Sequence, residues 1–287
     1  MTEVRRRRRP RLKRDELRYM GPPLEERTKK GVEQRDEHDT TQLKLENFRF
    51  QPHKDYLGHV LRWGFASRFV DRKTRVLDVG CGQEFPFLRS LGGSSASTVP
   101  EQYVGVDMNA LPEPPARKWA DVWEKTDVAE QTADLLEEYG PFSLIVCFEV
   151  YEHVPPRLAL PFLRALGELL AEDGRMVFST PVYCHSFKMA RNHVNERTKA
   201  EVEDDLCRAG FKVVDQFGTF GNYRDYVKML SREEREAYER QRAFYGDELM
   251  GCYLAPRFPE ASRNITHVVE HAFSETPEME LKESIVK

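Results

Sequence analysis

The stretch Arg75–Gly82, RVLDVGCG, decides the fold. Its aliphatic residues predict a short buried strand that ends near Asp78. Gly80 and Gly82 follow with one residue between them, and glycine lets the backbone turn sharply and come close to a ligand. We expect a helix directly after this loop, because helix N-terminal amides favour negatively charged or polar ligand groups. The pattern indicates a ligand-binding loop at the carboxyl end of the first strand of an open α/β sheet.

Two kinds of ligand compete for this loop. A dinucleotide-binding loop requires a third glycine at position 85, where this chain has Phe85. S-adenosylmethionine (SAM) has no pyrophosphate and does not require that glycine. A lone pair of glycines is equally typical of an ordinary strand-to-helix turn. The stretch Tyr103–Asp107, YVGVD, supports the functional interpretation, because it predicts a second strand ending in a carboxylate placed to bind ribose hydroxyls.

Together these stretches resemble the first two motifs of the class I SAM-dependent methyltransferases, although Glu84 stands where that family often has glycine. The resemblance covers roughly residues 50–272. It implies an α/β fold, a three-layer sandwich with a Rossmann-like, mostly parallel seven-stranded sheet whose last strand is antiparallel. It also implies SAM as the cofactor. The cofactor-binding candidates are Asp78, Gly80, Cys81, Gly82, Asp107, Met108, Asp127, Glu149, Tyr56 and Arg62.

Composition limits the class of protein. The chain has 287 residues, 40% hydrophobic residues and a net charge of −4, which favours one large domain with a substantial core. Its five cysteines are scattered without a CxxC pair, which predicts neither a zinc site nor disulfides and fits a reducing compartment. No apolar run is long enough to span a bilayer. We therefore expect a cytoplasmic protein without a membrane partner and without a metal.

The basic N-terminus is unlike the rest of the chain. Residues 1–45 contain the arginine run Arg5–Arg9 within the basic segment Arg5–Arg14, and such a charge density opposes packing. We expect a disordered tail. Its arginines can neutralise nucleic-acid phosphates without reading sequence, and a solvated tail with no specific partner is an equally good interpretation.

The expected methyltransferase domain spans residues 46–272 and begins with a cap helix over residues 46–70. Aromatic and aliphatic residues recur there at helical spacing. By the resemblance, Tyr56 and Arg62 contact the cofactor, whereas packing on the sheet explains them equally well. We expect the third strand near residues 118–123 and a helix from Asp127 to Tyr139. Asp127 is either the N-cap of that helix, paired with Glu130, or a contact to the adenine.

The fourth predicted strand, Phe142–Phe148, is followed by EVYEHV. This stretch resembles the E-x-x-E-H of small-molecule methyltransferases of the ubiquinone-biosynthesis type. It does not resemble the Pro-Pro loop of DNA and RNA amino-methyltransferases. His153 is a candidate general base because its ordinary pKa lies near neutrality. The alternative is that Glu149, Glu152 and His153 only brace the loop.

A second candidate region follows the predicted fifth strand, residues 176–180. The loop over residues 181–197 lies at the carboxyl edge of the sheet, where a substrate is expected. It contains Tyr183 and His193, which complete the catalytic candidates with His153. Its STP and HVNE stretches resemble those of sugar, lipid and quinone methyltransferases. A polar surface loop is the alternative.

The last part of the chain predicts an addition to the minimal fold. Thr198 and Glu201 predict a capped helix, followed by a sixth strand at residues 211–217. A charged helix at residues 231–249 interrupts the last two strands, so we expect residues 218–255 to form a substrate lid. A dimerisation helix or a solvated surface helix is the alternative. Residues 264–270 predict the antiparallel last strand, and residues 273–287 a frayed tail.

These expectations lead to one principal function and two alternatives. The principal function is transfer of the SAM methyl group to a small-molecule, sugar or lipid-like acceptor. A methyltransferase acting on nucleic acid or a modified base, with Arg5–Arg14 providing affinity, is the first alternative. A non-catalytic SAM-binding scaffold is the second. The sequence leaves the acceptor atom and the oligomeric state open.

Overall fold

A computed structural model describes residues 56–82, 85–92, 99–108, 122–125, 127–183, 189–190 and 192–272. The predicted N-terminal tail, the C-terminal tail and Glu84 lie outside these residues. Within the described residues, no helix is both long enough and apolar enough to cross a membrane.

Seven strands form one sheet in the order β3-β2-β1-β4-β5-β7-β6. The strands are β1 Arg75–Val79, β2 Gln102–Asp107, β3 Val122–Lys125, β4 Phe142–Phe148, β5 Leu170–Pro181, β6 Phe211–Phe220 and β7 Asn264–His271. Strands β1 to β5 pair in parallel, and β7 runs antiparallel to β5 and β6. The predicted seven-stranded sheet with an antiparallel last strand is confirmed.

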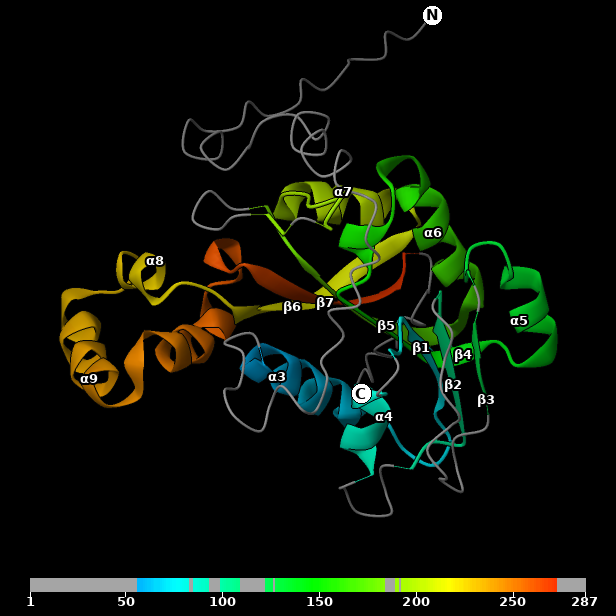
Figure 1. Cartoon of the computed structure of the whole chain (residues 1–287), viewed down its shortest axis with the longest axis horizontal. Helices are drawn as coiled ribbons and strands as arrows, with labels where there is room; N and C mark the ends of the chain where they lie inside the picture. The colour runs from blue at the N-terminus through cyan, green and yellow to red at the C-terminus, as the bar shows by residue number, and fades with distance from the viewer. Residues whose placement is uncertain are drawn as a thin grey trace, which may run out of the picture.

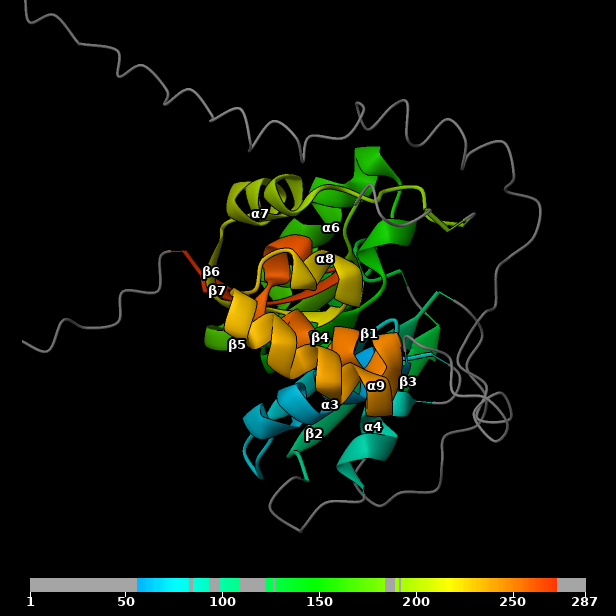
Figure 2. The same ribbon diagram turned by 90° about the vertical axis from the view of Figure 1, so that its left-hand side faces the viewer.

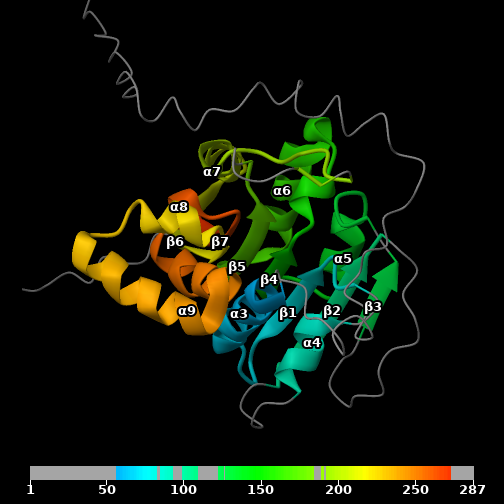
Figure 3. The ribbon, with the colours of Figure 1, turned by 60° about the vertical axis from the view of Figure 1, so that its left-hand side comes forward.

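Helices cover both faces of the sheet, as Figure 1 shows. The helices are α3 Tyr56–Ala66, α4 Pro86–Leu91, α5 Thr132–Glu138, α6 Pro156–Leu169, α7 Lys199–Arg208, α8 Tyr223–Val227 and α9 Arg232–Leu254. One face carries α5, α6 and α7, and the other carries α3 and α4 (Figures 1 and 3). The three-layer sandwich is therefore confirmed.

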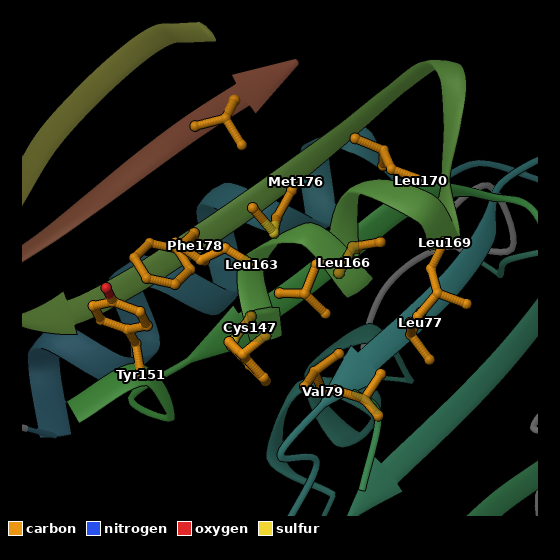
Figure 4. Close-up of a cluster of buried hydrophobic side chains, with 14 of the residues drawn as sticks. Leu77, Val79, Cys147, Tyr151, Leu163, Leu166, Leu169, Leu170, Met176 and Phe178 are labelled. Carbon is orange, nitrogen blue, oxygen red and sulfur yellow. The ribbon is translucent and has the colours of Figure 1, made fainter. Parts of the chain in front are cut away.

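Strand periodicity divides the apolar residues between the two layers, because successive side chains point to opposite faces. Leu77 of β1 belongs to the cluster on the α6 side, while Val76 belongs to the cluster beneath α3 and α4. Figure 4 shows Leu163, Leu166 and Leu169 of α6 beside the strands of the first cluster. This fully buried layer fixes β1 and β4, whose carboxyl ends carry the predicted cofactor loop and the E-x-x-E-H stretch.

The cap helix differs from its predicted form. Leu57, Val60 and Leu61 of α3 are 38–43% exposed, although their spacing predicted an inward apolar stripe. The buried side instead carries Arg62 and Trp63. The reason is an ion pair between Arg62 and Glu149, which draws the arginine rather than the aliphatic residues toward the sheet.

Three boundaries also need correction. The third strand is described at 122–125, and residues 118–121 of its predicted range lie outside the described residues. Helix α5 begins at Thr132 rather than at Asp127, because the Asp127 carboxylate accepts a hydrogen bond from the Ala129 amide and stabilises a turn instead. Strand β5 begins at Leu170 rather than at residue 176, and its pairing with β4 has a register irregularity between Phe142 and Leu144.

An insertion follows β6 and returns at β7, as predicted. Its main helix, α9, has a Ser231–Glu234 capping box and runs past Gly246, where φ is 76° and ψ is 168°. The insertion has its own small core, which includes Tyr223, Tyr226 and Leu254. Figure 2 shows α9 crossing beside α3. The 3-10 helices Ala255–Arg257 and Pro259–Ala261 lead back to the sheet.

Candidate functional site

The glycine loop and Asp107 lie together, as the sequence predicted. Gly80 and Gly82 have φ angles of +71° and +65°, which side-chain-bearing residues rarely adopt. The amides of Gly80 and Cys81 donate to the Val106 carbonyl at 2.8 and 3.1 Å. The Gly82 amide donates to Asp107 Oδ2 at 3.1 Å. These bonds hold the loop after β1 against the end of β2, so that its backbone and one carboxylate share the same edge of the sheet.

The side chains of Asp78 and Cys81 lie beneath this loop. Asp78 is buried and accepts a hydrogen bond from the Tyr103 hydroxyl. Burial raises the pKa of Asp78 to about 7, against the opposing effect of that hydrogen bond. Burial also raises the pKa of the Cys81 thiol, which packs in the apolar cluster under the loop. Cys81 can therefore face a ligand only through its backbone.

Three other predicted cofactor residues lie at the ends of elements: Met108 after β2, Asp127 after β3 and Tyr56 at the start of α3. Met108 follows Asp107 and is 71% exposed. Asp127 lies after β3, at the same edge of the sheet, with its Oδ1 at 3.0 Å from the Ala129 amide. Tyr56 begins α3, and its side chain lies outside the described ones. Contact of these residues with a cofactor stays a prediction.

Glu149 is the centre of a polar network that joins α3, β5 and β7 to the end of β4. Its φ angle is +56°, a left-handed conformation that is uncommon outside glycine. Its Oε1 accepts from Ser179 Oγ at 2.9 Å and lies 3.2 Å from Arg62 Nη1. Its Oε2 accepts a hydrogen bond from Asn264. Arg62, 1% exposed, thus contacts Glu149 directly, and its predicted contact with the cofactor is not tested.

Glu152, His153 and His193 form a second cluster. Glu152 is 1% exposed and accepts from Thr180 Oγ1 at 3.1 Å. Burial, reinforced by the charge of Glu149, raises the pKa of Glu152 to about 8. The His153 and His193 rings meet edge to face with their centroids 4.9 Å apart. One ligand atom from each of the three residues lies within 4.8 Å of the others.

Backbone bonds hold His193 against Glu152. The amides of Val194 and Asn195 donate to the Glu152 carbonyl at 2.8 and 2.9 Å. The His193 Nδ1 contacts Glu196, and Arg263 Nη1 lies 2.7 Å from Glu196 Oε2. Burial raises the pKa of Glu196, but the hydrogen bonds from His193 and Arg263 outweigh it and keep the pKa below its usual value.

The catalytic candidates are thus only partly brought together. His153 and His193 are in contact, and the backbone amide of Tyr183 donates to the Arg197 carbonyl at 2.7 Å. Sequence reasoning missed Arg263 and Asn264, which precede and begin β7 and carry no motif. It named the STP stretch without assigning roles to Ser179 and Thr180.

Comparison with known proteins gives a family match. A family model described as a methyltransferase domain matches residues 5–216. The ubiquinone biosynthesis O-methyltransferase of Aliivibrio fischeri strain MJ11 is 32% identical over 112 residues, which cover 37% of this chain and 43% of that protein. The enzyme of the same name from Aromatoleum aromaticum is 25% identical over 185 residues, covering 63% and 68%. The chain thus spans less than half the length of the first curated relatives it matches.

A solved structure supports the fold. The SAM-dependent methyltransferase from Archaeoglobus fulgidus has a TM-score of 0.50 and 17% sequence identity. The match covers 78% of this chain and 97% of that one. At this identity, the likeness concerns the arrangement of the sheet and helices.

Proposed function

The chain belongs to the methyltransferase-domain family, whose methyl donor is SAM, and we propose that it transfers that methyl group to a small-molecule acceptor. The acceptor is a sugar, a quinone precursor or a lipid-like compound. The names of the ubiquinone O-methyltransferases support this class of acceptor. The proposed methyltransferase domain spans residues 46–272.

The observation that carries the proposal is the pairing of the glycine loop with Asp107. The Gly82 amide lies 3.1 Å from Asp107 Oδ2, so the loop and the proposed ribose-binding carboxylate are held together. A dinucleotide fits less well, because Phe85 is 1% exposed and fills the position of the third glycine with a buried ring. We propose that Gly80, Cys81 and Gly82 face the methionine part of SAM through their backbone.

The acceptor side is proposed to be the edge formed by Glu149, Glu152, His153 and His193. The sulfonium of SAM is a strong electrophile, so the protein mainly has to align the acceptor and assist loss of its proton. The acceptor atom forms a bond to the methyl carbon, and the carbon–sulfur bond breaks with its electron pair remaining on sulfur. His153, which has a 41% exposed side chain, and His193 are the candidate proton acceptors, with Tyr183 at the start of the same loop.

Three further features belong to this proposal. Cys81, Cys147, Cys207 and Cys252 are free thiols, which supports a cytoplasmic location. The lid over the acceptor, predicted at 218–255, is proposed to be the insertion that begins after Phe220, because residues 218–220 belong to β6. The Arg5–Arg14 segment is proposed to be dispensable for transfer to a small molecule.

Calorimetric titration tests the cofactor. We expect micromolar binding of SAM and of S-adenosylhomocysteine to the full chain, and no binding of NAD. Circular dichroism of the same sample establishes that the protein is folded. Failure of folded protein to bind either compound contradicts the assignment.

Transfer of a labelled methyl group then tests the acceptor class. Catechols, sugars and lipids are compared with RNA and DNA, using the full chain and a variant lacking residues 1–20. Small-molecule methylation that is unchanged by the deletion supports the proposal. Activity only on nucleic acid, with steep salt dependence and loss on deletion, identifies the alternative instead.

A further inference from the structure

We propose that an apolar surface on α3 and α9 binds a second copy of this chain and makes the protein a two-fold symmetric dimer. This α3–α9 surface is formed by exposed side chains of two helices that contact each other (Figure 2). Its members are Leu57, Val60 and Leu61 of α3 and Phe244, Tyr245 and Tyr253 of α9. Single exposed apolar residues are normal on a protein surface, whereas a group of them marks a place of interaction.

The α3 part of the surface has no charge. Leu57, Val60 and Leu61 are spaced by three and four residues, so they lie on one side of the helix. The only charged residue of α3 is Arg62, which is buried against Glu149. The outer side of a surface helix ordinarily carries charged or polar residues. An apolar outer side on α3 therefore indicates that another molecule covers it.

The aromatic residues of α9 lie on both sides of a bend. The Tyr238 and Tyr253 rings are 6.1 Å apart, although a straight helix would separate these residues by about 22 Å. The helix therefore bends sharply at Gly246, and Phe244 and Tyr245 stand beside the bend. Phe244, Tyr245 and Tyr253 are 89%, 61% and 63% exposed, so these three side chains expose roughly 300–500 Å².

This area fits a second copy of the chain. A stable interface buries about 800 Å² on each partner. The three aromatic side chains of α9 supply about half of that area, and the aliphatic side chains of α3 with the polar atoms around them supply the rest. Tyr and Phe are also enriched in protein–protein interfaces.

The charges around the bend favour a second copy over a lipid surface. Helix α9 contains more acidic than basic residues, and anionic lipids repel such a helix. Arg240 and Glu248 stand four residues before and four residues after Phe244, are exposed, and form no ion pair among the described residues. In a two-fold contact centred on Phe244, Arg240 of one protomer faces Glu248 of its partner, and the reverse. The surface is thus complementary to itself in charge.

A partner on this surface also holds the cap helix in place. The inner side of α3 carries Arg62, which lies 3.2 Å from Glu149 at the edge where the acceptor is proposed to bind. A protomer packed on the outer side of α3 restricts movement of that helix away from the sheet. This consequence rests on the proposed function, whereas the dimer itself does not.

Sedimentation equilibrium of the full chain tests the dimer. Without any ligand, we expect wild type in the micromolar range to have twice the chain mass of 33.5 kDa. Leu61→Asp is expected to weaken self-association about 10–100-fold, because the contact would bury a charge without a partner. Leu158→Asp is the matched control, since both leucines are 43% exposed but Leu158 lies on α6, which covers the other face of the sheet.

A charge exchange tests the two-fold arrangement. Arg240→Glu and Glu248→Arg each place like charges opposite one another, so each is expected to weaken self-association several-fold. The double variant Arg240→Glu/Glu248→Arg should recover wild-type affinity. Circular dichroism identifies any variant that fails to fold. Phe244→Ser, at the most exposed of the six positions, provides a second variant that is expected to dissociate the dimer.

The outcomes separate the possible occupants of the surface. A monomeric wild type, or equal weakening by Leu61→Asp and Leu158→Asp, overturns the proposal. A monomer that sediments with vesicles of phosphatidylcholine and phosphatidylglycerol identifies a lipid surface instead. A monomer that binds S-adenosylhomocysteine contradicts the dimer alone, and a dimer that fails to bind it contradicts the cofactor assignment alone.

Discussion

Asp107 links the two sequence motifs at the scale of the single residue. Its carboxylate receives the Gly82 amide at 3.1 Å and remains partly accessible at the end of β2. The same oxygen that orders the loop is therefore close to the position proposed for the ribose. This double role makes the residue a sensitive test of the cofactor site.

Replacing Asp107 by alanine is expected to weaken S-adenosylhomocysteine binding about 10–100-fold, because hydrogen bonds to a charged group contribute about 1.5–3 kcal/mol each. Calorimetry measures the change. Asp204→Ala is the matched control, since that side chain is 70% exposed on α7. Equal affinities of the Asp107 and Asp204 variants would contradict the assignment.

His267 predicts a pH dependence of stability. Its ring is buried, and neither ring nitrogen has a hydrogen-bond partner among the described residues. Burial lowers its pKa from 6.5 to about 3. Between these values the unfolded chain takes up a proton that the folded chain does not, so stability falls as the pH drops below 6.5.

The expected loss from this residue is about 2 kcal/mol of unfolding free energy between pH 7 and pH 5, at 1.36 kcal/mol per pH unit. Urea denaturation at both pH values measures it. His267→Leu is expected to reduce this dependence, whereas His271→Leu should not. Identical pH profiles for wild type and His267→Leu would show that the ring is protonated in the folded state.

At the scale of the element, the path of α9 depends on the backbone conformation of Gly246. The φ of 76° and ψ of 168° at this position belong to a region that is essentially restricted to glycine. Gly64 of α3 provides a contrast, because it has no positive φ and a Cβ there would meet no atom within 4 Å. Replacement by alanine is therefore expected to change the stability of the protein in opposite directions at these two glycines.

Gly246→Ala is expected to destabilise the protein by about 1–3 kcal/mol through backbone strain. Gly64→Ala is expected to stabilise it by about 0.5–1 kcal/mol through helix propensity. Thermal unfolding of both variants checks the pair. A stabilising effect of Gly246→Ala would mean that α9 runs straight through this position.

The elements that could be predicted share a local cause. The apolar runs of β1 and β4 and the glycines at 80 and 82 are readable because burial and positive φ restrict the residues allowed there. The inward face of α3 was mispredicted because its buried position holds an arginine that only a distant glutamate explains. The Glu152–His193 contact was not predictable, since backbone bonds from Val194 and Asn195 create it.

At the scale of the whole molecule, Arg62 connects α3 to the sheet. The buried side chain is within 3.2 Å of Glu149 at the end of β4 and within 3.4 Å of Thr219 in β6. It therefore holds together elements that are far apart in the sequence.

Arg62→Met is expected to lower the unfolding free energy by about 3–5 kcal/mol, because it leaves the largely buried Glu149 carboxylate without its charge partner. Urea denaturation measures the loss. The double variant Arg62→Met/Glu149→Gln should recover part of it, since both charges are then removed. Additive effects in this cycle would mean that the two side chains do not interact.

The insertion between β6 and β7 has a practical consequence. It has its own small core, and it leaves and rejoins the sheet at two strands that already pair with each other. Residues 221–262 can therefore be exchanged for the corresponding segment of another enzyme, with Arg263 and its contact to Glu196 kept in place, without altering the sheet next to the glycine loop. Under the proposed role of this insertion as a lid over the acceptor, such grafts would allow acceptor preference to be engineered, or to diverge in evolution, independently of the methyl donor.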